Sequence, residues 1–250
     1  MAPYVSLAPC YDRLTSDVDY RAWADFYETV FKLNNLNVRS ILDLACGTGT
    51  LSYILARRGY EVIGTDASAD MLAMALSKAP EDENMVLPMF LNQTMQGLDL
   101  YGTVDAAVCC LDGINYLPSL KEVAEAFRRV HLFLNPGGIF IFDVNTPFKL
   151  RKLDGQVFLD EQEGLYCVWR ASFDESERAC YYGIDIFTQT GKLWRRDFEE
   201  HVEYAYTPEE LKKALETAGF SEINIYGELS LRPPKEDEER IFITARKMMK

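Results

Sequence analysis

The sequence predicts an α/β fold with a mostly parallel sheet and helices on both of its faces. Between residues 40 and 144, five short apolar runs alternate with segments of helical periodicity, which is the pattern of repeated strand–helix units. The fourth run, residues 104–111, is apolar throughout, as expected for a strand buried on both faces. From about residue 149 the pattern changes to alternating strands, so a second, antiparallel sheet is expected.

Local signals place the elements of the parallel part. Strands are expected at residues 40–44, 61–65, 85–91, 104–111 and 139–144. Helices are expected at residues 50–58, at 68–78 and from 119 onward. Gly59 is a C-terminal cap, Ser68 is an N-cap, and Ser119 opens a capping box with Glu122. The segment "NPGG", residues 135–138, is expected to be a turn before the fifth strand.

The flanking segments complete the expected architecture. Residues 3–36 form two amphipathic, aromatic-rich segments before the first strand. In the antiparallel insertion, hairpin turns are expected at Gly164, Asp174–Glu175 and Thr190–Gly191. A helix then begins after Thr207, with Pro208 at its first position and Glu210 completing a capping box, and it ends at Gly219. A closing hairpin is expected from residues 222–229 and 240–247.

Composition narrows the class of function. The chain has 26 Lys and Arg against 39 Asp and Glu, a formal net charge of −13, so nucleic acid is not an expected partner. No signal segment or membrane span is expected from the apolar patterning. The six cysteines contain no CxxC pair, which suits a reduced cytoplasmic protein without a metal site. Monomer and homodimer both remain open.

The turn after the first strand indicates what the fold binds. A dinucleotide site requires G-x-G-x-x-G, but Gly47 and Gly49 are followed by Ser52 in place of a third glycine. Asp43 precedes the turn, where its carboxylate would repel a pyrophosphate. Asp66 ends the second strand, where an acid can accept from both hydroxyls of a ribose. A nucleoside joined to a cationic group fits this pattern, and S-adenosylmethionine is such a molecule.

Several segments carry a family resemblance. The chain resembles class I S-adenosylmethionine-dependent methyltransferases through "LDLACGTG", "VIGTDASADML", "VDAAVCCLDGINYL" and "LNPGGIFIFDVN", over roughly residues 36–145, with "YTPEELKKALETAGF" in addition. The antiparallel insertion makes it similar to small bacterial members such as the sugar N-methyltransferases. The resemblance implies a Rossmann-like seven-stranded sheet with a C-terminal antiparallel strand. It also implies a cofactor-binding domain at 1–148 and 207–250 with an N-terminal helical lid, and an acceptor-side insertion at 149–206.

The resemblance assigns cofactor roles to residues near the carboxyl ends of the strands. Those expected to bind S-adenosylmethionine are Tyr11, Tyr20, Trp23, Asp43, Ala45, Gly47, Gly49, Asp66, Ala67, Met71, Thr94, Met95, Leu111 and Asp112. The glycines and the backbone of Ala45 would line the methionine part, with Asp43 near its ammonium group. Leu111 and Asp112 would border the sulfonium, while the three aromatic residues would close over the cofactor.

One position departs from the family pattern. Met71 is expected near the adenine, where relatives usually place an acid after the third strand that accepts from the adenine amino group. In this sequence that position is Thr94, followed by Met95. A neutral hydroxyl is a weaker partner than a carboxylate, so weaker or less selective adenine binding is expected.

Each assignment has a structural alternative. Asp43 alone could form a turn, and Asp66 alone could cap a strand end. Tyr11, Tyr20 and Trp23 could simply pack N-terminal helices against the sheet, as aromatic residues commonly do. Cys46 has no evident histidine partner, so core packing is expected instead of nucleophilic chemistry.

The candidate catalytic residues are His201 and Tyr116. His201 lies in the last strand of the insertion, and Tyr116 follows the fourth strand. Either could act as a base or contact the acceptor. The expected reaction is in-line methyl transfer to a small-molecule nitrogen or oxygen, with no metal. The alternatives are a non-catalytic S-adenosylmethionine-binding protein, a methyltransferase acting on protein or RNA, and an NAD-type oxidoreductase.

Overall fold

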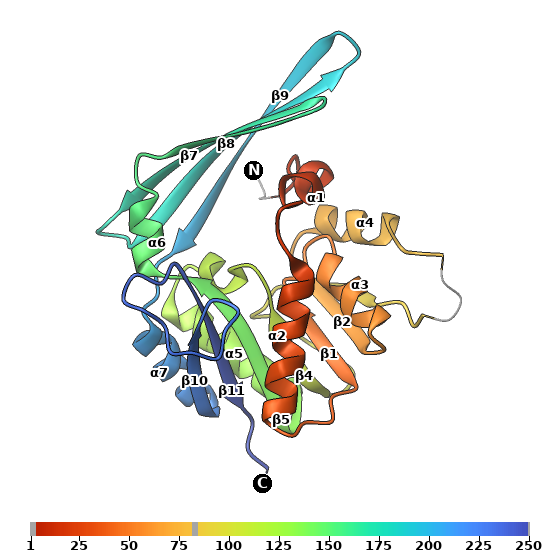
Figure 1. The fold of residues 1–250 in the computed structure, drawn as a ribbon, viewed down its shortest axis with the longest axis vertical. Coiled ribbons are helices and arrows are strands. Elements are labelled where there is room, and N and C mark those ends of the chain that lie inside the picture. The colour runs from red at the N-terminus through yellow and green to blue at the C-terminus, as the bar shows by residue number, and fades with distance from the viewer. Residues whose placement is uncertain (1–3, 82–84, 250) are drawn as a thin grey trace.

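The computed structural model describes residues 4–81 and 85–249 and contains two β-sheets (Figure 1). The larger sheet has seven strands in the order β10-β11-β5-β4-β1-β2-β3. These strands are β1 (Ser40–Leu44), β2 (Glu61–Asp66), β3 (Met89–Asn92), β4 (Val104–Cys109), β5 (Leu134–Asn145), β10 (Ser221–Gly227) and β11 (Arg240–Arg246). β11 alone runs in the direction opposite to the other six strands, which confirms the expected Rossmann-like sheet.

Helices cover both faces of this sheet. The long ones are α2 (Tyr20–Leu33), α3 (Thr50–Arg57), α4 (Ala69–Ser77), α5 (Leu120–Phe133) and α7 (Pro208–Ala218). The apolar sides of α2 and α3 pack with Ile41, Val108 and Ile141 on one face, the near face in Figure 1. The apolar sides of α5 and α7 pack on the other face against Leu42 and Phe142. Alternate residues of a strand therefore pack in two separate cores, because successive side chains of a strand point to opposite faces of the sheet.

The expected caps are formed with one exception. Ser68 accepts from the backbone N–H of Met71 at 3.2 Å, and Thr207 makes a complete capping box with Glu210. Ser119 accepts from the backbone N–H of Glu122 at 3.3 Å. The Glu122 carboxylate accepts from the side chain of Gln96, so the expected box at Ser119 is only half formed.

The second sheet is a four-stranded antiparallel meander above the first (Figure 1). Its strands, in spatial order, are β6 (Val157–Gln162), β7 (Leu165–Asp174), β8 (Ala179–Thr190) and β9 (Leu193–Tyr204). All three expected hairpins are present. The N-terminal segment, with η1 (Ala8–Cys10) and α1 (Tyr11–Leu14), contributes Leu7 and Cys10 to a small core with Cys167, Ile184 and Ile186 on the inner face of this sheet.

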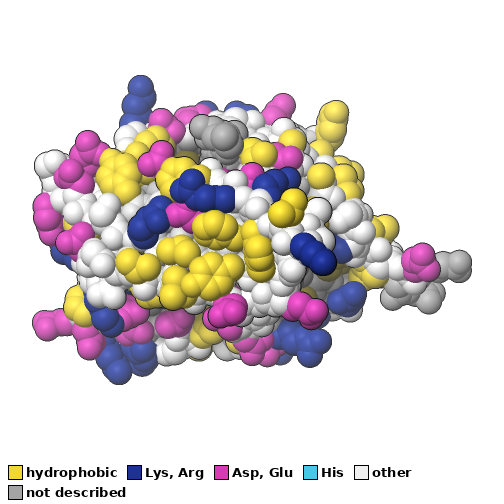
Figure 2. Space-filling view, turned by 90° about the horizontal axis from the view of Figure 1, so that it is seen from above, with side chains coloured by type: hydrophobic (Ala, Val, Ile, Leu, Met, Phe, Trp, Pro, Cys, Tyr) yellow, Lys and Arg dark blue, Asp and Glu magenta, His cyan; other side chains and the backbone are white. Residues whose placement is uncertain are grey.

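The outer face of the antiparallel sheet is exposed and mixed in character. Figure 2 shows hydrophobic side chains gathered on this side of the molecule among lysines and arginines. Leu159 and Trp194 are more than half exposed. Asp185 is only 4% exposed, and its carboxylate is paired with Arg170 at 2.6 Å and also with Arg196. The two faces of the sheet therefore differ in exposure, because only the inner face is covered by the rest of the chain.

Three expectations about elements need correction. The third strand begins at Met89 and not at residue 85, since Pro88 before it has no N–H for a sheet. "NPGG" is not a turn: it lies inside β5, where a Cβ on Gly138 would come within 2.8 Å of the Asp105 carbonyl oxygen. The insertion begins with an unexpected helix, α6 (Pro147–Lys152), capped by Thr146. The expected start of the N-terminal segments, residue 3, lies outside the described residues.

Candidate functional site

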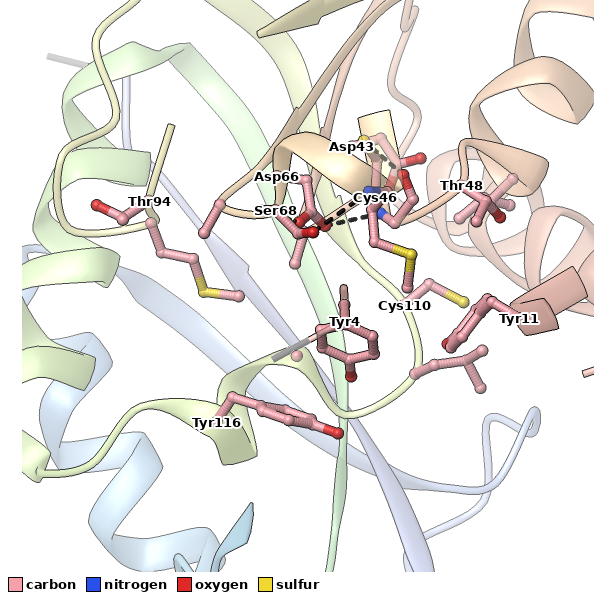
Figure 3. Close-up of a pocket in the computed structure, with 18 of the residues that line it drawn as sticks. Tyr4, Tyr11, Asp43, Cys46, Thr48, Asp66, Ser68, Thr94, Cys110 and Tyr116 are labelled. Carbon is pink, nitrogen blue, oxygen red and sulfur yellow. Dashed lines mark hydrogen bonds between the residues drawn. The ribbon is translucent and has the colours of Figure 1, made fainter. Parts of the chain in front are cut away.

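A cavity of about 550 Å³ lies at the carboxyl ends of β1, β2 and β4, where the strand order reverses. This switch point is the usual ligand site of open α/β sheets. The predicted site residues that line the cavity are Tyr11, Tyr20, Asp43, Ala45, Gly47, Asp66, Ala67, Met71, Thr94, Met95, Leu111 and Tyr116. Four predicted residues do not line it, and these are Trp23, Gly49, Asp112 and His201. Figure 3 shows how residues that line the cavity are arranged around it.

Asp66, the last residue of β2, is held in place by backbone groups. Its Oδ2 accepts from the N–H of Gly47 and its Oδ1 from the N–H of Ser68, both at 2.8 Å (Figure 3). Burial nevertheless raises the pKa of Asp66 above its ordinary value. A carboxylate offers about four lone-pair positions, so two remain for a ligand in the cavity. That capacity matches the two hydroxyls of a ribose.

Asp43 lies deeper, near the end of β1. It is 1% exposed and accepts from the Ser52 hydroxyl at 2.5 Å. Burial raises the pKa of Asp43 to about 7, and the neighbouring Asp66 adds to the shift. A cationic ligand would stabilise the ionised form of this carboxyl.

The charge of the cavity selects between ligands. The described residues that line it include three aspartates, Asp43, Asp66 and Asp70, and no lysine or arginine. A pyrophosphate would meet carboxylates here without a basic side chain to neutralise it, whereas an ammonium or sulfonium would be stabilised. The residues present therefore fit S-adenosylmethionine: Asp66 would hold the ribose, and Asp43 would lie on the side of the ammonium group.

The turn after β1 contains several residues in the left-handed backbone conformation. Gly47 and Gly49 have φ values of +55° and +73°, and Ala45 is also left-handed at +55°. A Cβ on Gly49 would lie 2.7 Å from the Phe90 ring, so this glycine allows close packing behind the turn instead of lining the cavity. Gly47 carries the N–H that binds Asp66.

The loop after β4 is strained and fixed by a buried carboxylate that the sequence analysis missed. Leu111 and Asp112 have φ values of +58° and +54°. Asp143, near the end of β5, accepts from both of their N–H groups, at 2.9 and 3.1 Å. Arg240 pairs with Asp143 and, at 2.7 Å, with Asp112. Such strain persists only where surrounding contacts enforce it.

The predicted aromatic lid divides into two parts. Tyr11 and Tyr20 line the cavity, together with Tyr4, which the sequence analysis did not single out. Trp23 lies in the core below, where its indole N–H donates to Asp143 at 3.2 Å and its ring packs beside Phe242. The α2 residue therefore supports the loop that borders the cavity and does not close over the ligand.

The adenine end has neutral polar groups. Thr94 lines the cavity, but its hydroxyl accepts from the N–H of Gly97 at 3.1 Å and closes a turn. Gln93 and Gln96 also reach the lining, while Met95 is buried. The lining residues that follow β3 are therefore uncharged, although Asp70, next to Met71, also lines the cavity.

His201 is buried behind the cavity wall. Its ring is 3% exposed and its Nε2 lies 3.0 Å from the Glu199 carboxylate. The Tyr4 ring stands edge-on to it, with centroids 4.5 Å apart. Glu199 also accepts from the backbone N–H of Tyr4 at 2.8 Å and of Leu7 at 3.1 Å. This pair fastens the N-terminal segment to β9 and so holds Tyr4 over the cavity.

Tyr116, in η2 (Gly113–Tyr116), reaches the cavity directly. Its ring centroid lies 5.9 Å from that of Tyr4, and Figure 3 shows the two rings together on the side away from Asp43 and Asp66. Burial raises the pKa of Tyr116, and Glu203 and Asp112 raise it further. Glu203 was not predicted, because an acid in a strand of mixed pattern gives no sign of being buried.

The described part of the chain gives little support for a metal site or for thiol chemistry. Residues 4–81 and 85–249 contain no group of three His, Cys, Asp or Glu side chains placed to hold a metal ion. Burial raises the pKa of Cys46, which keeps this thiol protonated, and all six cysteines are unpaired. Within the same residues, no helix is both long and apolar enough to span a bilayer.

Together these features define a nucleoside site that prefers a cationic group, the site of a class I S-adenosylmethionine-dependent methyltransferase. A family model described as a methyltransferase domain matches residues 41–138. YqeM of Bacillus subtilis (strain 168), named as a methyltransferase, is 32% identical over 246 residues, 98% of this chain and 97% of YqeM. The chain belongs to the methyltransferase family, and S-adenosylmethionine is its cofactor.

Solved structures agree with this assignment. A crystal structure of an S-adenosylmethionine-dependent methyltransferase from Clostridium acetobutylicum ATCC 824 is 30% identical, covers 99% of this chain and 100% of its own, and has a TM-score of 0.87. The sugar N-methyltransferase KedS8 from Streptoalloteichus shares the fold at a TM-score of 0.80 and 22% identity, over 95% of this chain and 92% of KedS8. The chain is therefore an enzyme that transfers methyl groups, and neither a binding-only protein nor an oxidoreductase.

Proposed function

We propose that this methyltransferase acts on a nitrogen or oxygen atom of a small molecule, with residues 149–206 forming the acceptor side of the site. The observation that carries the proposal is the pair of tyrosine rings that covers one end of the cavity. Tyr4 and Tyr116 lie together at its end, and the inner face of β9 backs them through His201. A closed end of this kind suits a small acceptor, and the net charge of −13 disfavours RNA.

The expected chemistry is in-line displacement at the methyl carbon. S-adenosylmethionine supplies a methyl group on a positively charged sulfur, which a lone pair of the acceptor attacks. The residues of the chain contribute mainly by fixing geometry and excluding water. Asp66 and Asp43 would hold the two ends of the cofactor, and the Leu111–Asp112 backbone, locked by Asp143, would border the reacting centre.

The two predicted catalytic residues are given different roles in this proposal. Tyr116 lines the cavity and is placed to contact the acceptor. His201 does not line it and is bonded to Glu199 behind Tyr4. We therefore assign His201 to positioning Tyr4, and we keep Tyr116 as an acceptor contact.

The proposal is tested by methyl transfer to a panel of small acceptors. The purified protein is incubated with S-adenosylmethionine and pairs of molecules that differ only in the acceptor atom, such as glycine and glycolate or glucosamine and glucose. Formation of S-adenosylhomocysteine that depends on a panel member supports a small-molecule acceptor. Turnover that requires added bulk protein or RNA, with the panel silent, would contradict it.

A further inference from the structure

The N-terminal segment, residues 4–20, covers the cofactor cavity and is fastened at two places. Tyr4, Tyr11 and Tyr20 line the cavity from this segment. Figure 1 shows the segment between the antiparallel sheet and α4. One fastening is to the antiparallel sheet, and the other is to the turn and helices that follow β1 and β2. The cofactor cavity is therefore closed on this side by a segment that two sets of contacts hold down.

The fastening to the antiparallel sheet is buried. The Glu199 carboxylate of β9 accepts from the backbone N–H groups of Tyr4, Ser6 and Leu7. It also lies 3.0 Å from Nε2 of His201. Burial would raise the pKa of Glu199, but these hydrogen bonds lower it overall. Separating a buried carboxylate from so many donors is costly, so this end of the segment is expected to stay attached.

The second fastening, which we call the latch, consists of Asp12, Thr48, Thr50 and Lys78. Asp12 lies in α1, Thr48 in the turn after β1, Thr50 at the start of α3, and Lys78 at the C-cap of α4. Asp12 accepts from both threonine hydroxyls and pairs with the Lys78 ammonium. Lys78 also donates to Thr50 at 2.8 Å and to Thr48 at 3.1 Å. Each hydroxyl thus donates to the aspartate and accepts from the lysine, so the polar groups of the latch satisfy one another.

The latch lies between the cofactor cavity and a second cavity. The second cavity has a volume of about 430 Å³, and Asp12 and Lys78 line it. None of its lining residues is buried, so it faces solvent. Thr48 lines the cofactor cavity, while Thr50 and Tyr20 line both. The wall that separates the two cavities is therefore thin, and the latch holds it together.

The latch is more exposed than the fastening at Glu199. The side chains of Asp12 and Lys78 are 41% and 29% exposed, whereas that of Glu199 is 1% exposed. Water can solvate both ions when a partly exposed pair separates, so such a pair adds little net stability and is weakened by salt. The N-terminal segment is therefore expected to separate at the latch before it separates from the antiparallel sheet.

We propose that the latch is the gate through which the cofactor is exchanged. Opening of the latch joins the two cavities, so that S-adenosylmethionine enters and S-adenosylhomocysteine leaves, while Glu199 keeps the segment on the sheet. Closing it returns Tyr11 and Tyr20 to the cavity and excludes water from the bound cofactor. Asp12 is thus a positioning residue, and no covalent bond changes in this step. The inference goes beyond the proposed function, because it concerns the cofactor and holds for any acceptor.

A gate and a binding residue have different kinetic effects. Because a gate must open in both directions, its loss raises the association and dissociation rate constants together and leaves their ratio, the affinity, nearly unchanged. A residue that only stabilises the bound cofactor changes mainly the dissociation rate constant, so its loss weakens the affinity. The two rate constants for S-adenosylhomocysteine therefore test the proposal without any acceptor.

The first experiment compares Asp12→Ala with Asp17→Ala, a control at an exposed acid of the same segment. Surface plasmon resonance on the immobilised protein gives both rate constants for S-adenosylhomocysteine. In D12A both should rise about tenfold, with the affinity within about threefold of the wild type, because the latch is a partly exposed pair. D17A should match the wild type. Unchanged rate constants in D12A, or faster dissociation with an equal loss of affinity, would overturn the proposal.

Further variants break the latch from its other side and then restore it. Lys78→Met should raise both rate constants as D12A does. Asp12→Lys combined with Lys78→Asp places an ion pair of opposite polarity between the same threonines, whose hydroxyls can donate and accept either way. Circular dichroism first shows that each variant is folded. Both rate constants should return toward the wild-type values in the double variant, and values that stay at the level of the single variants would overturn the proposal.

Salt gives a measurement that a purely structural role would not change. In the wild type both rate constants should rise about threefold between about 0.05 and 1 M sodium chloride, because salt screens the exposed pair. S-adenosylhomocysteine carries one ammonium and one carboxylate at about pH 7, so it has no net charge and its own binding adds little to this dependence. D12A should lack the rise. Equal salt dependence in D12A and the wild type would overturn the proposal.

Discussion

The cofactor half and the proposed acceptor half of this site are built in different ways. In the cofactor half, Asp43, Gly47 and Asp66 come from two adjacent strands and one turn, and their contacts are mostly to nearby backbone. In the proposed acceptor half, Tyr4 lies near the N-terminus and His201 lies on β9, and their rings meet only through tertiary packing. The first half is a local structural unit, whereas the second depends on the whole chain.

The two halves meet at one buried ion cluster. Arg240, the first residue of β11, joins Asp112 of the cofactor loop to Asp143 of β5. Although burial disfavours its charge, Asp143 and Asp112 raise the pKa of Arg240. The position of the loop after β4 is therefore fixed by a strand far away in sequence. This cluster links the local half of the site to the dispersed half.

The largest expected effect follows from breaking this cluster. Arg240→Met should lower the free energy of unfolding by about 3–5 kcal/mol, because two buried carboxylates lose their counter-charge. Urea denaturation measures the loss. The control is Arg232→Met, which breaks a pair with Glu238 whose arginine side chain is 41% exposed, and little change is expected. Equal losses in the two variants would show that the buried cluster does not join the halves.

The next effect tests the local half alone. Asp66→Asn should weaken S-adenosylmethionine binding about 100-fold, roughly 2.7 kcal/mol, because charge-assisted hydrogen bonds to the ribose are lost. Titration calorimetry gives the affinity, and Asp99→Asn, at an exposed side chain, is the matched control. An unchanged affinity in D66N would remove this residue from the cofactor site.

The same contrast explains what could be predicted from the sequence. The order of strands, the Gly turn and the acid that ends β2 depend on hydrophobic period and turn chemistry, which neighbouring residues determine. Asp43 and Asp66 were accordingly predicted, and both line the cavity. Glu203 and Arg240 were not, because their burial results from strands that pair across long sequence separations. No local pattern encodes such a contact.

The predicted residues that lie outside the cavity lining have a related explanation. Trp23 and Gly49 were assigned to the ligand by family resemblance, yet the structure places them one layer behind the cavity. Both act through a neighbour: Trp23 through Asp143, and Gly49 by leaving space for Phe90. A motif identifies residues that a site requires, but only packing tells whether they face the ligand or support those that do.

An effect that is smaller when counted per pH unit concerns the pH dependence of stability. The pKa of Asp43 is raised from 3.8 to about 7, so between these values the folded protein holds a proton that the unfolded chain has released. Its contribution to stability therefore falls as pH rises from about 4 to 7, by at most about 1.4 kcal/mol per pH unit. Asp43→Asn should lack this slope in denaturation curves at several pH values. An identical slope in D43N would show that Asp43 titrates normally in the fold.

The smallest expected effect tests whether Trp23 supports the site or binds S-adenosylmethionine. Trp23→Phe removes one donor to Asp143, which retains the two backbone donors and Arg240, so a loss of about 1 kcal/mol in unfolding free energy is expected. The affinity for S-adenosylmethionine should change by less than about twofold, because the indole does not line the cavity. A loss of affinity that exceeds the loss of stability would place Trp23 in the lid after all. It would also show that the local half of the site reaches into the N-terminal helix when the cofactor binds.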